Sequence, residues 1–207
     1  MYLERTLSPY IAKFSKFFPV VLITGPRQVG KTTIFESAKS EQRTYITLDD
    51  PMLRTLAQND PQLFLSTYKA PILIDEVQYA PQLFPYIKMI VDKEKKPGAF
   101  WLTGSQVFTL MKNVTESLAG RVGILELQGL SQSEKAKFPN RKPFLPTSDL
   151  TSEIPPFDLN SLYDMIFKGS SPAVVANKDA QWQSFYRSYV STYIERDVKQ
   201  ILNITQE

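Results

Sequence analysis

A run of five apolar or β-branched residues, Val20–Thr24, is followed directly by the segment GPRQVGKTT at residues 25–33. The run is typical of a buried strand, and residues 34–39 favour a helix. The glycines let successive backbone N–H groups turn toward an anion, and the helix directs its positive end to the same place. The sequence therefore predicts a strand–loop–helix unit that binds phosphate, and with it a nucleoside triphosphate.

Individual residues of this loop have distinct predicted tasks. Lys31 carries a mobile charge that can reach the β- and γ-phosphates, and the Thr32 hydroxyl is placed to ligate Mg²⁺. A plain glycine turn with an exposed lysine is the alternative, and it is disfavoured because the strand and helix that the motif requires are both present. The loop residues predicted to bind the nucleotide are Gly25, Pro26, Arg27, Gln28, Val29, Gly30, Lys31, Thr32 and Thr33.

A second apolar run, Ile72–Glu76, looks like a Walker B strand because it ends in two acids. Asp75 would hold Mg²⁺ through its waters beside Thr32, and Glu76 would polarise the attacking water. The chain has no histidine and no cysteine, so a carboxylate is the natural candidate for this general-base role. Two acids that merely cap the next segment are the alternative, and the phosphate loop upstream favours the catalytic interpretation.

Hydroxyl and guanidinium side chains accompany the later strands. Thr103 and Ser105 lie at the end of a strand expected over 99–103, where ligands of a doubly wound sheet bind. Either hydroxyl could hold the lytic water or sense the γ-phosphate, and Ser105 could equally cap the next helix. Arg121 directly precedes a strand expected over 122–127; it is either a surface arginine or one that stabilises charge on a γ-phosphate.

Strands and helices alternate along this part of the chain, which predicts a parallel sheet covered on both faces. Asp50 and Asp60 each precede a proline, a pattern that caps and opens a helix. The further elements that we expect are a strand over 44–48, helices over 2–17, 51–58, 61–67 and 83–95, and two short helical stretches after Gln106.

The character of the chain changes at residue 137. Five prolines and few periodic apolar residues mark 137–157 as an extended loop or linker. A helix is expected near 159–168 and a long one over 179–202, whose aromatic stripe could stack on bases but at helical spacing favours a core. We therefore divide the chain into an ATPase core at 1–136, a proline-rich linker at 137–157 and a helical lid at 158–207.

Charge and hydropathy limit the partners. The formal net charge of +3 is too small by itself to indicate nucleic acid or an anionic membrane. The apolar runs are too short to span a bilayer, and the N-terminal residues, with an acid at Glu4, do not resemble a signal peptide. We therefore expect a cytoplasmic protein that binds ATP; a homo-oligomer and binding to nucleic acid stay open, the second without support from charge.

Taken together, several segments resemble a large prokaryotic group of AAA-superfamily ATPases: GPRQVGKTT, LDDP, ILIDEVQYAP, LTGSQ and SLAGRV. Full-length members carry a second, uncharacterised C-terminal domain of the DUF4143 type, similar to a restriction-nuclease fold, and the resemblance implies that it is largely absent here. It also implies an α/β fold: a P-loop NTPase αβα sandwich with a five-stranded parallel sheet in the order 5-1-4-3-2, followed by a small helical segment.

The resemblance implies roles for single residues as well. Asp75 and Glu76 would be the Walker B pair, and Thr103 or Ser105 would be the sensor-1 hydroxyl. Arg121 resembles the arginine finger of AAA proteins. A Gly-Gly-x-Pro segment of the family stands here as GSSP at 169–172, and it implies that Pro172 contacts adenine.

The function expected is that of a Mg²⁺-dependent ATP hydrolase acting as a switch or small machine. A P-loop kinase is one rival, which Glu76 argues against because a water-activating acid would promote wasteful hydrolysis. A nucleotide-dependent module that binds DNA or protein with little hydrolysis is the other.

Overall fold

The computed structural model describes residues 2–39, 42–105, 107–137, 158–177 and 179–193. The chain divides into two compact units. The first is Arg5–Gln128, and the second is Gly129–Glu207 together with Met1–Glu4.

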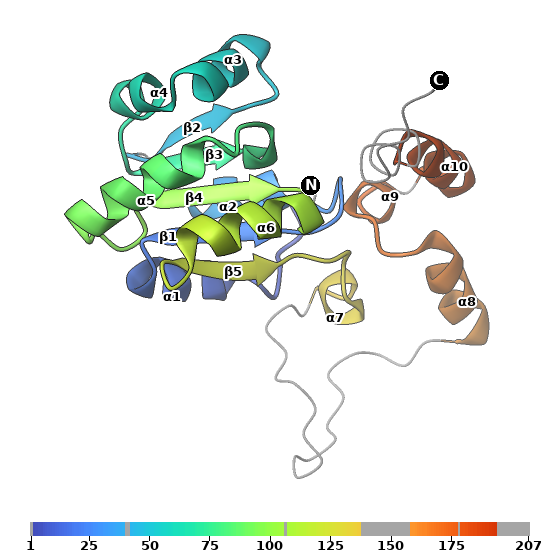
Figure 1. The fold of residues 1–207 in the computed structure, drawn as a ribbon. Coiled ribbons are helices and arrows are strands. Elements are labelled where there is room, and N and C mark those ends of the chain that lie inside the picture. The colour runs from blue at the N-terminus through green and yellow to red at the C-terminus, as the bar shows by residue number, and fades with distance from the viewer. Residues whose placement is uncertain (1, 40–41, 106, 138–157, 178, 194–207) are drawn as a thin grey trace, which may run out of the picture. The chain divides into compact units, whose positions relative to one another are not determined.

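A parallel sheet of five strands, counted among the described residues, forms the centre of the unit 5–128 (Figure 1). Its spatial order is β2-β3-β4-β1-β5. Read from the other edge, this is the expected order 5-1-4-3-2, so the predicted sheet is confirmed. The strands are β1 (Val20–Thr24), β2 (Thr44–Thr47), β3 (Ile72–Asp75), β4 (Phe100–Gly104) and β5 (Val122–Glu126).

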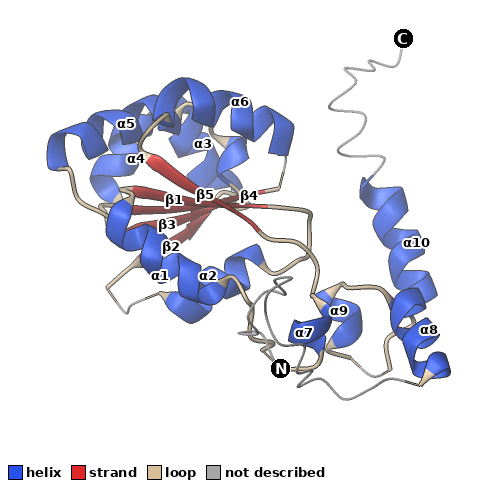
Figure 2. Cartoon of the chain, turned by 90° about the horizontal axis from the view of Figure 1, so that it is seen from below, coloured by secondary structure: helices blue, strands red, loops and turns tan. Residues whose placement is uncertain are grey.

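Helices cover both faces of this sheet, which makes the expected αβα sandwich (Figure 2). On one face lie α1 (Ser8–Phe17) and α2 (Lys31–Ala38). On the other face lie α3 (Pro51–Asn59), α4 (Pro61–Thr67), α5 (Leu83–Glu94) and α6 (Val107–Leu118). A short 3₁₀ helix, η1 (Val77–Tyr79), follows β3.

Strand β1 is buried along its whole length because both of its faces are covered. Val20 and Leu22 pack in the cluster with α3–α6, whereas Val21 and Ile23 pack with α1 and α2. The period-2 alternation of a strand thus sends successive side chains into two different apolar layers. This burial explains why the sequence of β1 is continuously apolar instead of alternating.

Aspartates begin α3 and α4, as the sequence predicts. The Asp50 carboxylate accepts hydrogen bonds from backbone N–H groups of the first turn of α3, and Asp60 does the same for α4. Pro51 and Pro61 follow at the first helical position, where the missing N–H costs nothing.

Two helix predictions were wrong. The helix expected over 2–17 begins only at Ser8, because Pro9 occupies its first turn and proline is disfavoured further inside a helix. The two short stretches expected after Gln106 are the single helix α6. Leu110, Val114 and Leu118 recur every four residues along it and are all buried, so one apolar stripe holds it together.

The second unit is helical where it is described. Its helices are α7 (Gln132–Lys135), α8 (Leu159–Lys168), α9 (Pro172–Val175) and α10 (Trp182–Tyr193). The helix predicted near 159–168 is therefore confirmed as α8. The Tyr186 hydroxyl of α10 donates a hydrogen bond to the carbonyl oxygen of Lys168, the last residue of α8, at 2.9 Å. Residues 138–157, most of the expected linker, and 194–202 of the expected long helix lie outside the described residues.

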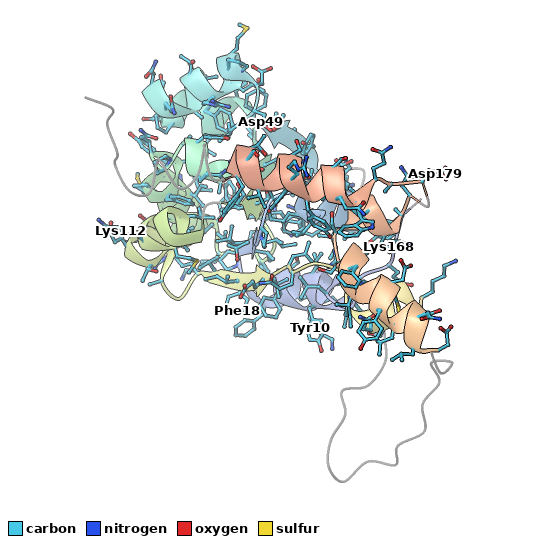
Figure 3. The ribbon with its side chains drawn as sticks, turned by 90° about the vertical axis from the view of Figure 1, so that its right-hand side faces the viewer. Tyr10, Phe18, Asp49, Lys112, Lys168 and Asp179 are labelled. Carbon is cyan, nitrogen blue, oxygen red and sulfur yellow. The ribbon has the colours of Figure 1, made fainter. Side chains whose placement is uncertain are left out.

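The apolar faces of α8 and α10 are not buried. Neither helix contains a buried residue among those described. Lys168, the last residue of α8, is labelled in Figure 3. The prediction that the aromatic residues of the long helix form a core was therefore wrong for α10, which has no buried residue among those described. Phe185, Tyr189 and Tyr193 instead stack on one another along the surface of the helix, one helical turn apart. Across the described residues, no helix combines the length and the apolar character needed to cross a membrane.

Candidate nucleotide-binding site

The phosphate loop runs from the end of β1 to the start of α2 and requires glycine at both of its ends. Gly25 has a φ of 144°, and a Cβ there would lie 2.1 Å from the carbonyl oxygen of Leu127. Gly30 has a φ of 92°, and Gln28 is also left-handed at 59°. Backbone in such conformations turns consecutive N–H groups toward one side. The loop therefore has the curled backbone that an anion requires.

The start of α2 adds positive potential to the same place. Its N-cap is Gly30, which has no side chain to satisfy the free N–H groups of the first turn. These groups and the helix dipole favour an anion. Lys31, the first helical residue, is 5% exposed, and its Nζ donates to the carbonyl oxygens of Gly25 and Pro26 at 3.0 and 2.7 Å.

Burial lowers the pKa of Lys31, and the charges of Glu76 and Asp75 partly oppose this effect. The neighbouring cation Arg27 lowers the pKa further. A desolvated ammonium next to a second cation gains when an anion approaches. The loop therefore holds a lysine whose charged form a bound anion would stabilise.

The carboxylate of Asp75, at the end of β3, accepts hydrogen bonds from three hydroxyl groups. Thr32 Oγ1 donates to its Oδ1 at 2.8 Å, and Thr103 Oγ1 donates to the same oxygen. Tyr45 donates from β2 to Oδ2 at 3.1 Å. Asp75 is 6% exposed, so these donors replace water around its carboxylate. The structure thus brings together the two residues predicted to hold Mg²⁺, Thr32 and Asp75.

Glu76 follows with an unusual backbone. Its φ and ψ are 56° and 45°, a left-handed conformation that costs a non-glycine residue about 1–3 kcal/mol and clusters at functional sites. The Glu76 N–H donates to Thr103 Oγ1 at 3.1 Å. Its carboxylate accepts from Ser105 Oγ at 3.1 Å and from Gln78 Nε2. Thr103 at the end of β4 therefore contacts both acids, and Ser105, the next residue after the strand, contacts Glu76.

Sequence reasoning missed Gln78 and Tyr45. Gln78 is 8% exposed; its Nε2 also lies 3.3 Å from Ser105 Oγ, and its Oε1 has no hydrogen-bond partner among the described residues. Its position two residues after Glu76 was the available signal. Tyr45 gave a weaker signal, because its contact with Asp75 depends on β2 lying beside β3.

Tyr45 has a pKa raised to about 12, chiefly by burial and then by the charge of Asp75. The folded protein therefore holds this proton more tightly than the unfolded chain, for which a pKa of about 10 is usual. The contribution of Tyr45 to the free energy of unfolding is complete below pH 10 and is lost as the pH rises toward 12.

We expect Tyr45→Phe to show a shallower fall in the free energy of unfolding between pH 10 and pH 12 than the wild type. Urea unfolding at several pH values in this range measures the two slopes. Tyr10→Phe, at a half-exposed tyrosine of α1, serves as the control and should follow the wild type. Parallel curves for Tyr45→Phe and the wild type would contradict the assignment of this slope to Tyr45.

One predicted residue of the unit 5–128 lies away from this cluster. Arg121 precedes β5, at the amino ends of the strands, whereas the loop lies at their carboxyl ends. Its guanidinium pairs with Asp92 of α5, with Nη2 at 2.9 Å from Oδ2, and this hydrogen bond lowers the pKa of Asp92. Pro172 opens α9 in the other unit, and its contact with adenine stays a prediction.

Comparisons with known proteins fit this geometry. The model of a family described as an AAA domain matches residues 18–136. This range includes both the phosphate loop and the acid pair Asp75 and Glu76. The chain belongs to this AAA domain family. Uncharacterised proteins of Mycobacterium tuberculosis and Mycobacterium bovis are each 34% identical over 186 residues. These matches cover 88% of this chain but only 37% of either relative, so the chain spans well under half of their length.

Among solved structures, AMPPCP-bound DnaA from Aquifex aeolicus superposes with a TM-score of 0.53. The match covers 97% of this chain and 70% of that one, at 14% sequence identity. At this identity the likeness concerns the fold. The chain thus has the P-loop NTPase fold. Its membership of the AAA domain family indicates a nucleotide-binding, ATPase-type function.

Proposed function

We propose that this AAA domain is a Mg²⁺-dependent ATP hydrolase that acts as a switch or small machine. The observation that carries the proposal is the placement of Glu76, whose carboxylate is held by Ser105 and Gln78 directly beside the Asp75–Thr32 pair. ATP as the nucleotide is supported by the DnaA structure of the same fold, which was solved with AMPPCP bound.

The Thr32–Asp75 pair fits Mg²⁺. Both side chains offer hard oxygen ligands, and one or two protein ligands combined with phosphates and water is the usual way in which Mg²⁺ is bound. Three hydroxyls now hydrogen-bond to the Asp75 carboxylate, so it is oriented before any ion arrives. Thr32 and Asp75 would hold the ion, and the chemistry it would supply there is neutralisation of phosphate charge.

The other residues divide the work of binding and hydrolysis. Backbone N–H groups of the loop residues other than Pro26 surround the phosphates, and Lys31 transfers its hydrogen bonds from loop carbonyls to phosphate oxygens. Glu76 accepts a proton from the attacking water and orients it. Ser105 keeps that carboxylate in place, and Thr103 fixes the spacing between the two acids because it contacts Asp75 and the Glu76 N–H together.

Phosphate release from ATP by the purified chain, with Mg²⁺ and after its removal with EDTA, tests the proposal. Release that requires Mg²⁺ and no added acceptor supports a hydrolase. ATP binding without release would favour the nucleotide-dependent binding module. Transfer to an acceptor in place of release would favour the kinase.

We expect Lys31→Ala to weaken AMPPCP binding by about a hundredfold, because the phosphates lose a charged donor whose hydrogen bonds each contribute about 1.5–3 kcal/mol. Isothermal titration measures the dissociation constant. Lys39→Ala is the matched control, since this lysine near the end of the same helix pairs with Glu36 at the surface. Equal affinities for Lys31→Ala and the wild type would contradict the assignment of the phosphate loop.

A further inference from the structure

Arg5 is a buried arginine to which the chemistry above gives no role. It is 5% exposed and lies in the segment before α1. Its Nη1 donates to the carbonyl oxygen of Val29 at 2.8 Å, and its Nη2 donates to that of Gln128 at 2.6 Å. Arginine is seldom buried this completely unless its charge is satisfied. One fork-shaped guanidinium here joins two segments that are far apart in the sequence.

The contact with Val29 fixes one amide of the phosphate loop. A trans peptide unit is planar, and its C=O and N–H point in opposite directions. A Val29 carbonyl held by Arg5 therefore directs the Gly30 N–H away from the guanidinium. Gly30 lies at a φ of 92°, where glycine is free to adopt other conformations, so this amide needs an external restraint.

The contact with Gln128 involves the segment that packs against the other end of the loop. The Leu127 N–H donates to the carbonyl of Thr24 at 2.8 Å. The Leu127 carbonyl lies so close to Gly25 that no side chain fits there. Arg5 therefore ties the last part of the loop to the strand extension that abuts its first residue, and the loop is held at both ends.

Arg5 also lies at both places where the chain passes between its two compact units. One boundary is Glu4–Arg5 and the other is Gln128–Gly129. Arg5 is thus the residue that follows the first boundary, and its side chain hydrogen-bonds to Gln128, the residue that precedes the second boundary. Because the same guanidinium also hydrogen-bonds to Val29, a displacement of Val29 would affect the chain at both boundaries.

We propose that Arg5 is a positioning residue that keeps the phosphate loop in its anion-binding form and transmits occupancy of the loop to both connections with the second unit. The coupling to ATP rests on the proposed function of this site. Lysine does not replace arginine in this role, because its flexible ammonium lacks the rigid, planar fork that holds the Val29 and Gln128 carbonyls at fixed positions.

Arg43 offers a matched control. It is also a partly buried arginine bound to backbone carbonyls, and Nη2 donates to Gly98 O at 2.7 Å. Its Nη1 donates to the carbonyls of Ile72 and Ala99. These carbonyls lie at the amino ends of β3 and β4, the end of the sheet away from the loop. Arg43→Ala should therefore lower stability and leave nucleotide affinity unchanged.

Hydrogen exchange without nucleotide tests the positioning role. The two variants are compared under conditions where Arg5→Ala and Arg43→Ala have equal global stability. The amides at residues 27–31 should then exchange at least about tenfold faster in Arg5→Ala than in Arg43→Ala, because the loss of a charged hydrogen bond lowers the free energy of local opening. Equal exchange in the two variants would overturn the positioning role. If Arg5→Ala does not fold, Arg5→Lys takes its place with the same expectation.

AMPPCP titration and exchange with nucleotide test the coupling. Arg5→Ala and Arg5→Lys should bind AMPPCP about tenfold to a hundredfold more weakly than the wild type. At saturation, amides at residues 4–6 and 127–130 should gain protection in the wild type and not in these variants. Unchanged affinity with protection retained would overturn the coupling. A wild type that binds no AMPPCP would overturn the proposed function and this coupling, while the exchange without nucleotide still decides the positioning role.

Discussion

Glu76→Gln is expected to lower phosphate release by about two to four orders of magnitude, the usual scale for the loss of a general base. Glutamine has nearly the shape of glutamate, and its amide oxygen can still accept the hydrogen bond that Ser105 now donates. The backbone of residue 76, with its left-handed conformation, is unchanged by the substitution. What is lost is the carboxylate that accepts a proton from water, so the affinity for AMPPCP and Mg²⁺ should stay close to that of the wild type.

Single-turnover phosphate release and AMPPCP titration separate these two effects. Glu36→Gln is the matched control, because Glu36 lies at the surface of α2 and pairs with Lys39. This control should hydrolyse ATP at the wild-type rate. Rapid turnover by Glu76→Gln would move the general base elsewhere, and a parallel loss of binding would instead make Glu76 a structural residue.

The phosphate loop and its flanking elements could be predicted because the necessary information is local. A buried strand, glycines at fixed spacing and a helix start lie in one continuous stretch, and Gly25 and Gly30 have the positive φ that such a loop requires. The acid pair was also predictable, since β3 is short, apolar and ends at Asp75.

Contacts that depend on strand order could not be derived from local patterns. Tyr45 reaches Asp75 only because β2 lies beside β3, and periodicity does not reveal which strands are neighbours. The strand order itself came from the resemblance to a known family. Arg5 is a stronger example, since it bonds to Gln128, 123 residues away in the sequence.

The aromatic stripe of α10 shows a different limit. Its period correctly indicates a helix with one apolar face, but a period does not show what covers that face. In the structure, Tyr189 and Tyr193 stack on each other at 5.9 Å between ring centroids, and Tyr193 is 38% exposed. Periodicity therefore predicted the element and gave the wrong environment for it.

Arg121 cannot serve the nucleotide of its own chain from the position that it occupies. Parallel β1 and β5 pair Val20 with Val122 and Thr24 with Glu126. Arg121 lies before the first pair and the loop lies after the last, so about four residues of strand, or about 13 Å, separate them even before the side chains are considered. The guanidinium also points to Asp92 on the flank of α5. Any role at a γ-phosphate is therefore a role in a neighbouring subunit.

Arg121→Ala should then lower the rate of ATP hydrolysis by about a thousandfold or more, which is the usual contribution of an arginine finger. The affinity for AMPPCP should be unchanged. The interface would be heterologous, so it should produce a ring or an open chain, and specific activity should rise with protein concentration. Lys112→Ala, which removes an exposed cation from α6, is the control for general effects of charge on this flank.

Mixing two inactive variants gives the sharpest test of this arrangement. In an assembly of Arg121→Ala and Glu76→Gln subunits, some interfaces combine the intact Glu76 of an Arg121→Ala subunit with the intact Arg121 of its Glu76→Gln neighbour. Those sites hold a complete set of catalytic groups, so the mixture should regain hydrolysis that neither variant has alone. Activity per subunit that is flat with concentration, together with an inactive mixture, would remove Arg121 from the catalytic site and leave it as the surface partner of Asp92.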